Sequence, residues 1–248
     1  MYNLLISLAA AALVYLGLSQ VAPSPWMAVA GGMLAGAVGF LLLARRTNRQ
    51  LESRVKDVES ALGAGRADEA IAILENTKAQ LGRWQFMIPT LIDGQIGVLR
   101  YAHKQQLDEA RPYLEKALAN NWHAKAMLAA YHYKRRQYEA MNKVFEAAVK
   151  ANKQAELLWA AYAWCEASRG DRDAAVAVLE RAVKEVKDSE RLKRCLNDLR
   201  SKKRLNMTPF TPEWWILHLE RPPVQLGTQA GSMRGLPPGA RMKVRRVR

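Results

Sequence analysis

The stretch Gly170-Asp171-Arg172-Asp173-Ala174-Ala175-Val176-Ala177-Val178-Leu179-Glu180-Arg181-Ala182 decides how this 248-residue chain folds. Within it, a small residue is followed four positions later by a large apolar residue, and three positions after that by another small residue. The spacing recurs at intervals of 40, 31 and 34 residues, as Ala70 and Leu74, Ala110 and Leu114, Met141 and Phe145, and Ala175 and Leu179. A repeat length near 34 residues predicts an array of similar units.

Residues 47–200 have apolar residues at three and four spacing, which is typical of amphipathic helices. A single helix pair cannot bury its apolar face alone, so successive pairs are expected to stack into a curved array. The first helix of each pair then lines the inner face. The segment Ser189–Leu205 carries Leu192, Leu196 and Leu199 on one face and predicts a capping helix.

These features resemble the tetratricopeptide repeat family, in which a small residue opens the second helix of each antiparallel pair. Residues Gly170–Ala182 match best, and Trp159 and Ala163 precede them where the family prefers Trp and a small residue. The first unit matches only in Gly65 and its second helix. The resemblance implies an all-α solenoid of three to four helix pairs that binds protein partners.

Residues 1–44 contain no Asp, Glu, Lys or Arg, and two apolar runs, 2–20 and 26–44, are each 19 residues long. Such a run spans a hydrocarbon core of about 30 Å at about 1.5 Å per residue. Pro23 and Pro25 separate the runs and favour a tight connection. Residues 1–46 are therefore predicted to form a transmembrane helical hairpin, with Gly32 and Gly36 on a face that allows close helix approach.

Basic residues set the expected orientation, because they stay on the cytoplasmic side of a membrane. A signal peptide is the alternative for the first run, but that run lacks a basic start, and the second run would still anchor the chain. We expect a multi-pass protein of a bacterial inner membrane with both termini cytoplasmic. The residues that crowd the membrane exit are Arg45, Arg46, Arg49, Arg54 and Lys56.

The final segment, 206–248, combines a short predicted helix with a basic tail. Thr211 suits the cap, Pro212 the first turn, and Trp214 and Trp215 either dock on the array or lie among lipid headgroups; we favour docking. Residues 201–248 carry a net charge of +8, and the tail composition is typical of disorder. Candidates for contact with anionic lipid or nucleic acid are Arg234, Arg241, Lys243, Arg245, Arg246 and Arg248.

Residues for catalysis or metal binding are sparse. The four His residues have neither the four-residue spacing of a helical metal pair nor a nearby Cys pair, and no phosphate-binding glycine motif occurs. Cys165 and Cys195 read as packing residues. We therefore predict no enzyme activity, no cofactor and no metal.

Binding is the better prediction. The expected inner face is mostly apolar, with aromatic and basic residues near its middle, and suits an amphipathic helix or an extended peptide. For Tyr133 and Trp164, stacking between repeats is an equal alternative. The predicted groove residues are Ile92, Gln95, Leu99, His103, His123, Tyr133, Lys134, Leu157 and Trp164.

Together these features predict a membrane-anchored adaptor or scaffold that recruits protein partners to the cytoplasmic face of the inner membrane. The alternative is a membrane protein that tethers RNA or DNA through its basic tail.

Overall fold

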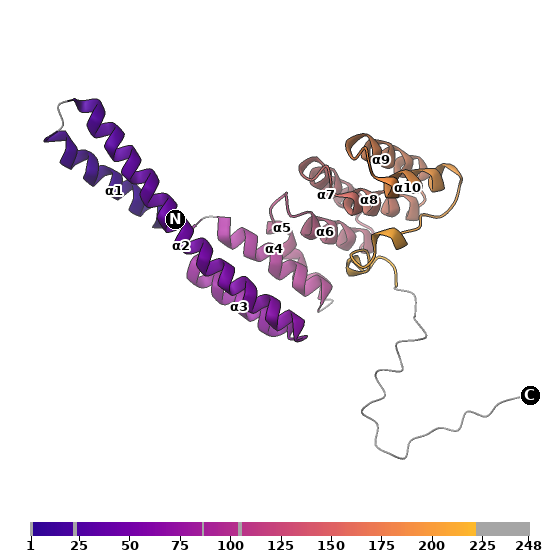
Figure 1. The fold of residues 1–248 in the computed structure, drawn as a ribbon. Coiled ribbons are helices and arrows are strands. Elements are labelled where there is room, and N and C mark those ends of the chain that lie inside the picture. The colour runs from indigo at the N-terminus through magenta and orange to yellow at the C-terminus, as the bar shows by residue number, and fades with distance from the viewer. Residues whose placement is uncertain (1, 22–23, 86, 104–105, 222–248) are drawn as a thin grey trace, which may run out of the picture.

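The computed structural model describes residues 2–21, 24–85, 87–103 and 106–221, and every regular element in them is helical (Figure 1). Two short 3₁₀ turns, η1 (Thr208–Phe210) and η2 (Trp215–Leu217), follow the last α-helix. The α-helices are α1 (Tyr2–Ser19), α2 (Pro25–Gly63), α3 (Ala67–Leu81), α4 (Met87–Ala102), α5 (Leu107–Lys116), α6 (Trp122–Lys134), α7 (Tyr138–Ala151), α8 (Glu156–Ser168), α9 (Arg172–Glu185) and α10 (Glu190–Arg200).

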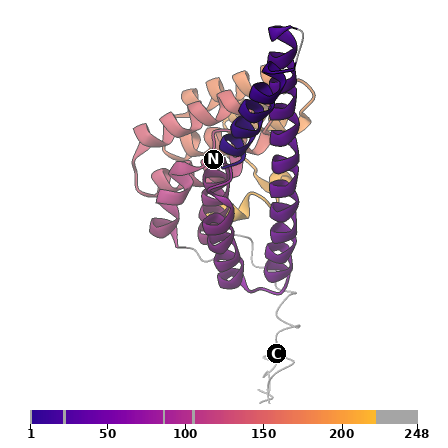
Figure 2. The same ribbon diagram turned by 90° about the vertical axis from the view of Figure 1, so that its left-hand side faces the viewer.

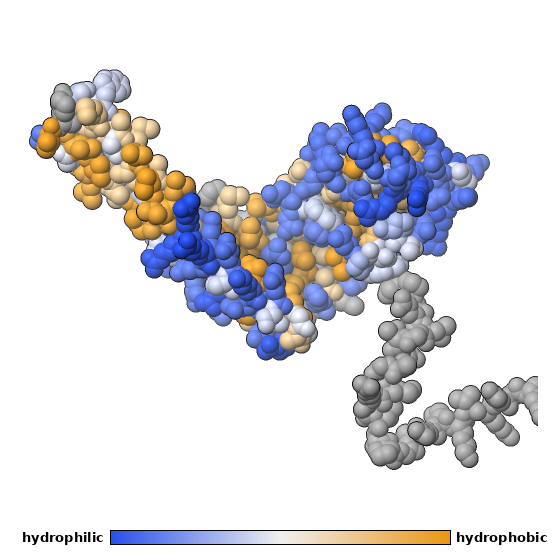
Figure 3. Space-filling model, in the orientation of Figure 1, coloured by the Kyte–Doolittle hydropathy of each residue, from blue (hydrophilic) through white to orange (hydrophobic). Residues whose placement is uncertain are grey.

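Helices α1 and α2 form an apolar hairpin that projects from the rest of the molecule (Figures 1 and 3). Both helices are long and apolar enough to span a membrane. Their contact depends on glycine, because a Cβ on Gly32 would come within 2.9 Å of the Ala11 carbonyl oxygen, and one on Gly36 within 2.9 Å of the Ala11 Cβ. The face of α2 that carries Gly32 and Gly36, predicted to allow close helix approach, therefore packs against α1.

Helix α2 continues past the expected end of the anchor. It runs without a break for 39 residues, about 58 Å at about 1.5 Å per residue, and its second half packs on α3 (Figure 2). Charged residues begin at Arg45, but charge does not end a helix, and no proline follows until Pro89. The apolar hairpin and the first helix of the array thus share one rigid element.

The start of α1 is tied to the array as well. The backbone N–H of Tyr2 donates to the Arg83 carbonyl at 3.0 Å, and the Tyr2 ring packs edge-on against Trp84 with centroids 5.7 Å apart. The buried Asn3 amide donates to the Thr47 hydroxyl at 3.2 Å. The chain therefore enters and leaves the hairpin at the same end, next to the array.

Beyond the hairpin, consecutive helices pack as pairs: the second half of α2 with α3, α4 with α5, α6 with α7, and α8 with α9. The first helices of neighbouring pairs also adjoin, since α4 contacts α6, and α6 contacts α8. Helix α10 packs on α9 and α8 and closes the row where a capping helix was predicted. We call α4, α6 and α8 the inner layer.

The repeated sequence positions form the core between paired helices. Ala70, Ala110, Met141 and Ala175 are fully buried, and so are the large apolar residues that follow them by four positions, apart from a small exposed fraction of Leu74. The spacing therefore predicted the buried positions of α3, α5, α7 and α9.

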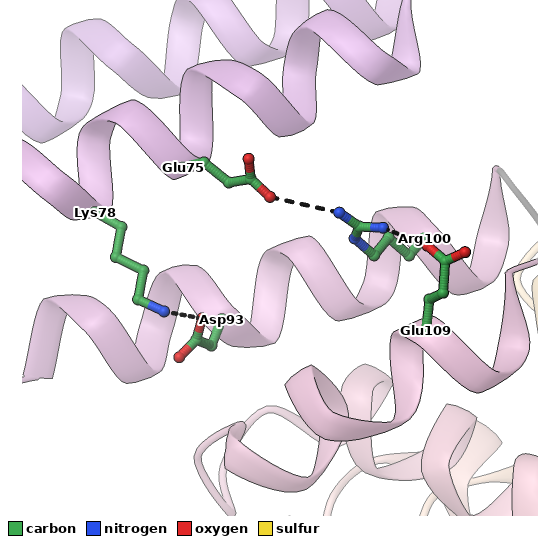
Figure 4. Close-up of polar contacts among 5 residues, drawn as sticks. All are labelled: Glu75, Lys78, Asp93, Arg100 and Glu109. Atoms are coloured by element: carbon green, nitrogen blue, oxygen red, sulfur yellow. Dashed lines mark hydrogen bonds and ion pairs between the residues drawn. The ribbon is translucent and has the colours of Figure 1, made fainter.

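Ion pairs join α3, α4 and α5. The Arg100 guanidinium donates to Glu109 at 2.6 Å and to Glu75 at 3.4 Å, and the Lys78 ammonium donates to the buried Asp93 at 2.5 Å (Figure 4). Glu109 lies in the first turn of α5, where a negative charge also favours the helix dipole. Acids at the starts of second helices thus serve the packing of helices.

The short helix expected to start at Thr211 forms only as the 3₁₀ helix η2. Thr211 instead ends η1, its hydroxyl donating to the Thr208 carbonyl, and the segment turns so that Phe210, Trp214 and Leu217 are all buried. Tertiary burial of these side chains outweighs the local helix-start signal. The predicted start of the helix was wrong, whereas docking of the Trp pair on the array is confirmed for Trp214.

Replacing Phe145 by Ala tests the packing of the repeat. Phe145 is fully buried and stacks on Tyr162 with centroids 4.8 Å apart, so Phe145→Ala should lower the free energy of unfolding by about 3–5 kcal/mol. Chemical denaturation in detergent measures the loss. The exposed control Lys143→Ala should change stability by less than about 0.5 kcal/mol, and a loss below about 1 kcal/mol for Phe145→Ala would contradict the packing.

Candidate functional site

The inner layer is covered by the chain's own residues 205–220, which we call the strap (Figure 1). The Tyr101 hydroxyl donates to the Leu217 carbonyl at 2.9 Å, and the His218 ring donates through Nε2 to the Ala102 carbonyl at 3.2 Å. Trp214 is fully buried and meets Trp164 edge-on at 5.2 Å. The strap thereby contacts α4 and α8, and η2 packs on α6.

A carboxylate lies at the centre of this contact. Glu220 accepts hydrogen bonds from the indole N–H of Trp164 at 3.3 Å and of Trp214 at 3.0 Å, and it pairs with Arg204 at 3.2 Å. Charge-assisted hydrogen bonds are stronger than neutral ones. Two indoles from different segments and one acid therefore hold the strap against α8.

The beginning of the strap is fixed at α10. Arg172 of α9 donates to the Leu199 carbonyl at 3.2 Å and to the Lys203 carbonyl at 2.6 Å, which satisfies backbone acceptors at the end of α10. The Arg191 guanidinium lies 5.5 Å from the centre of the Phe210 ring. The chain is therefore held on both sides of the turn that leads into the strap.

Burial changes the acid–base properties of the groups under the strap. It raises the pKa of Tyr101, so the phenol stays protonated and keeps donating to the strap. It lowers the pKa of His218, and the nearby Lys134 ammonium lowers it further. It also lowers the pKa of His123, although Glu213 of the strap opposes that change.

The predicted groove residues divide into three groups. Ile92, Leu99 and Leu157 are core residues, so their expected place in an open groove is wrong. Trp164 is buried against Trp214, and His123 and Tyr133 are half-buried. Those that remain exposed are Gln95, His103 and Lys134.

The error on α4 is one of helical phase. Ile92 is 1% exposed and packs between α2, α3 and α4, whereas its neighbour Leu91 is 43% exposed. One residue rotates the helix face by about 100°. Met87, Leu91 and Gln95, at four-residue spacing, therefore form the uncovered face of α4.

Tyr133 and Trp164 contact each other across neighbouring repeats. Their rings meet edge-on with centroids 5.6 Å apart, one from α6 and one from α8. Stacking between repeats, the alternative expected from the sequence, is therefore confirmed. Both rings also line a cavity.

That cavity, of about 620 Å³, lies between the end of α8, the start of α9 and the end of α10. It is rich in cations and lacks acids. Sequence reasoning missed it, because Lys202 and Lys203, which follow α10, were read as the surface of a capping helix, and Arg172 belongs to a different helix, α9. Its lining residues are Tyr133, Trp164, Ala167, Ser168, Gly170, Arg172, Leu199, Lys202, Lys203, Arg204 and Leu205.

Groups with other chemistry are few in the part of the chain that the structure describes. It contains no cluster of three His, Cys, Asp or Glu residues suited to a metal ion. Burial raises the pKa of Cys165 well above its usual range and that of Cys195 to about 11, so both thiols pack as neutral groups. The tail residues proposed for lipid or nucleic-acid contact lie outside the described residues.

Comparisons with protein-family models, curated proteins and solved structures found no match to this chain. Functional inference therefore rests on the geometry of the inner layer, the strap and the cavity.

Removing Trp214 should release the strap. Trp214→Ala deletes a fully buried side chain and one hydrogen bond to Glu220, and cleavage by trypsin after Arg204 should accelerate at least tenfold. Limited proteolysis with mass spectrometry measures the rate. Trp215→Ala is the matched control, because Trp215 is only half-buried. Equal rates in wild type and Trp214→Ala would contradict the docking.

The strap should also loosen in acid. Because the docked state lowers the pKa of His218 below its usual 6.5, protonation opposes docking, so stability is complete above pH 6.5 and falls as the pH drops below it. His218→Gln keeps a donor for Ala102 but cannot take up a proton. The Tm of His218→Gln minus the Tm of wild type should therefore be larger at pH 5.5 than at pH 7.5. A pH-independent difference would contradict this role of His218.

Proposed function

We propose that this protein is a membrane-anchored adaptor that recruits protein partners to the cytoplasmic face of a bacterial inner membrane through a tetratricopeptide-like helical array. The anchor would be the α1–α2 hairpin, and the array would be the recognition surface. Neither element needs catalytic chemistry for this role, because an adaptor works by raising the effective concentration of its partner.

The hairpin supports the membrane part of the proposal. Both of its helices are long and apolar enough to cross a bilayer, and apolar side chains cover its outside (Figure 3). Its two ends meet the array, where Arg45, Arg46 and Arg49 follow the apolar segment of α2. Cytoplasmic retention of basic residues then favours a cytoplasmic array.

The pairing of helices supports the tetratricopeptide-like part. Four consecutive pairs in the described residues carry the small and large residues of the repeat at buried positions. The first helices of α4–α5, α6–α7 and α8–α9 adjoin, as expected for an array with an inner face. This arrangement is one on which an elongated segment can lie across several units.

The observation that carries the proposal is the docking of the strap on the inner layer. The inner layer already binds an aromatic segment of two 3₁₀ turns through ring contacts, the Tyr101 hydroxyl and the two indoles around Glu220. Binding of such a segment in cis supports recognition of segments from other proteins by the same layer or by its uncovered part on α4.

Capture of partners from detergent-solubilised membranes tests the proposal. Leu91→Asp places a charge on the uncovered face of α4, and it should reduce the yield of specific partners at least fivefold by mass spectrometry. Ala177→Asp, on the exposed face of α9, is the matched control and should retain them.

Two results would contradict recognition of protein partners through α4. If the Leu91→Asp variant still captured the partners, the uncovered face of α4 would not be the surface that recognises them. Partners lost after ribonuclease treatment, or after Arg245→Glu plus Arg246→Glu, would favour the alternative of nucleic-acid tethering through the tail.

A further inference from the structure

The 620 Å³ cavity at the far end of the array is built for an anion. Four of its lining residues are cationic and none is acidic: Arg172, Lys202, Lys203 and Arg204. Two of them are engaged already, since Arg172 donates to backbone carbonyls and Arg204 pairs with Glu220. For Lys202 and Lys203, no carboxylate partner occurs among the residues that the structure describes.

Lys202 and Lys203 have no Asp or Glu partner in the described ranges, which hold every Asp and Glu of the sequence, and residues 222–248 contain none. Unpaired ammonium groups beside a cavity attract an anion. A carboxylate side chain for Lys202 and Lys203 is therefore expected from another molecule.

Another part of the cavity lining is apolar and aromatic. Tyr133 and Trp164 meet edge-on there, beside Leu199 and Leu205. The volume falls within the range of about 300–1,000 Å³ that is usual for ligand sites. A fitting ligand thus carries both negative charge and an apolar side chain.

Two residues of the lining already bind a carboxylate. Trp164 and Arg204 line the cavity, and both hold the side chain of Glu220, at 3.3 Å and 3.2 Å. Glu220 belongs to the strap, which is an aromatic segment with an acidic residue. The chain therefore contains, in cis, an example of the chemistry that this end of the array recognises.

We propose that this cavity binds an acidic, apolar-containing peptide segment of a protein partner, with its carboxylates on Lys202 and Lys203 and its apolar side chain against the half-buried ring of Tyr133. This inference rests on the adaptor function proposed above and names the chemistry of the partner. The cavity lies at the α9–α10 end, remote from the apolar hairpin, which disfavours lipid headgroups as its ligand (Figure 1). Trp164 is only 6% exposed and offers no ring face for stacking a nucleobase.

Fluorescence anisotropy on the full-length protein in non-ionic detergent tests the inference. The probe is a fluorescein-labelled peptide with four Glu residues around one Phe, and the same peptide with Gln in place of Glu is the neutral comparison. Lys202→Glu plus Lys203→Glu should weaken binding of the acidic peptide at least tenfold. Arg245→Glu plus Arg246→Glu makes the same charge change in the tail and should weaken it less than twofold.

Equal weakening by the two double variants would overturn the inference, because it would show attraction to net charge alone. Equal affinity for the Gln peptide would also overturn it. The inference would also be overturned if the wild-type protein bound a labelled twelve-nucleotide RNA more tightly than the acidic peptide, and if Lys202→Glu plus Lys203→Glu abolished that RNA binding. Unchanged thermal unfolding of that variant shows that the fold is intact.

The two proposals fail separately. Absence of peptide binding, with partner capture still sensitive to Leu91→Asp, overturns the cavity alone. Peptide binding at Lys202 and Lys203, with partner capture insensitive to Leu91→Asp, contradicts the recognition surface on α4 and leaves the cavity standing.

Discussion

The buried contact between Trp214 and Trp164, closed by the carboxylate of Glu220, determines what the inner layer can do. A fully buried indole contributes several kcal/mol, and an acid held by two indole N–H groups and a guanidinium is costly to leave unpaired. The contact fixes the strap across α4, α6 and α8. It also shapes one wall of the basic cavity, so recognition at the cavity and docking of the strap share Trp164 and Arg204.

A second constraint acts at the other end of the molecule. Because α2 is one helix from Pro25 to Gly63, the direction of the apolar hairpin is also the direction of the first helix of the array. The contacts of Tyr2 with Arg83 and Trp84 brace that joint. An array held in this way is presented at a fixed angle to the hairpin, and its cavity lies at the end remote from the hairpin.

Sequence reasoning succeeded where local pattern and burial agree. The small-to-large spacing around Ala175 and Phe145 reflects close helix contact within one pair, so it predicted which positions are buried. It failed where contacts distant in sequence decide the outcome. No helix starts at Thr211, because the segment turns to bury Trp214, and the predicted groove on α4 wrongly included the buried residues Ile92 and Leu99. The cavity could not be predicted, because its residues come from four helices and from the chain that follows α10.

Hydrogen exchange of the strap in the full-length protein tests the central claim most directly. The amides of Trp214, Leu217 and His218 donate to backbone carbonyls within the docked segment. If the strap covers the inner layer, peptides spanning residues 207–219 should exchange at least a hundredfold more slowly than the same segment as a free peptide. Exchange at the free-peptide rate would show that the inner layer is open and would contradict the account.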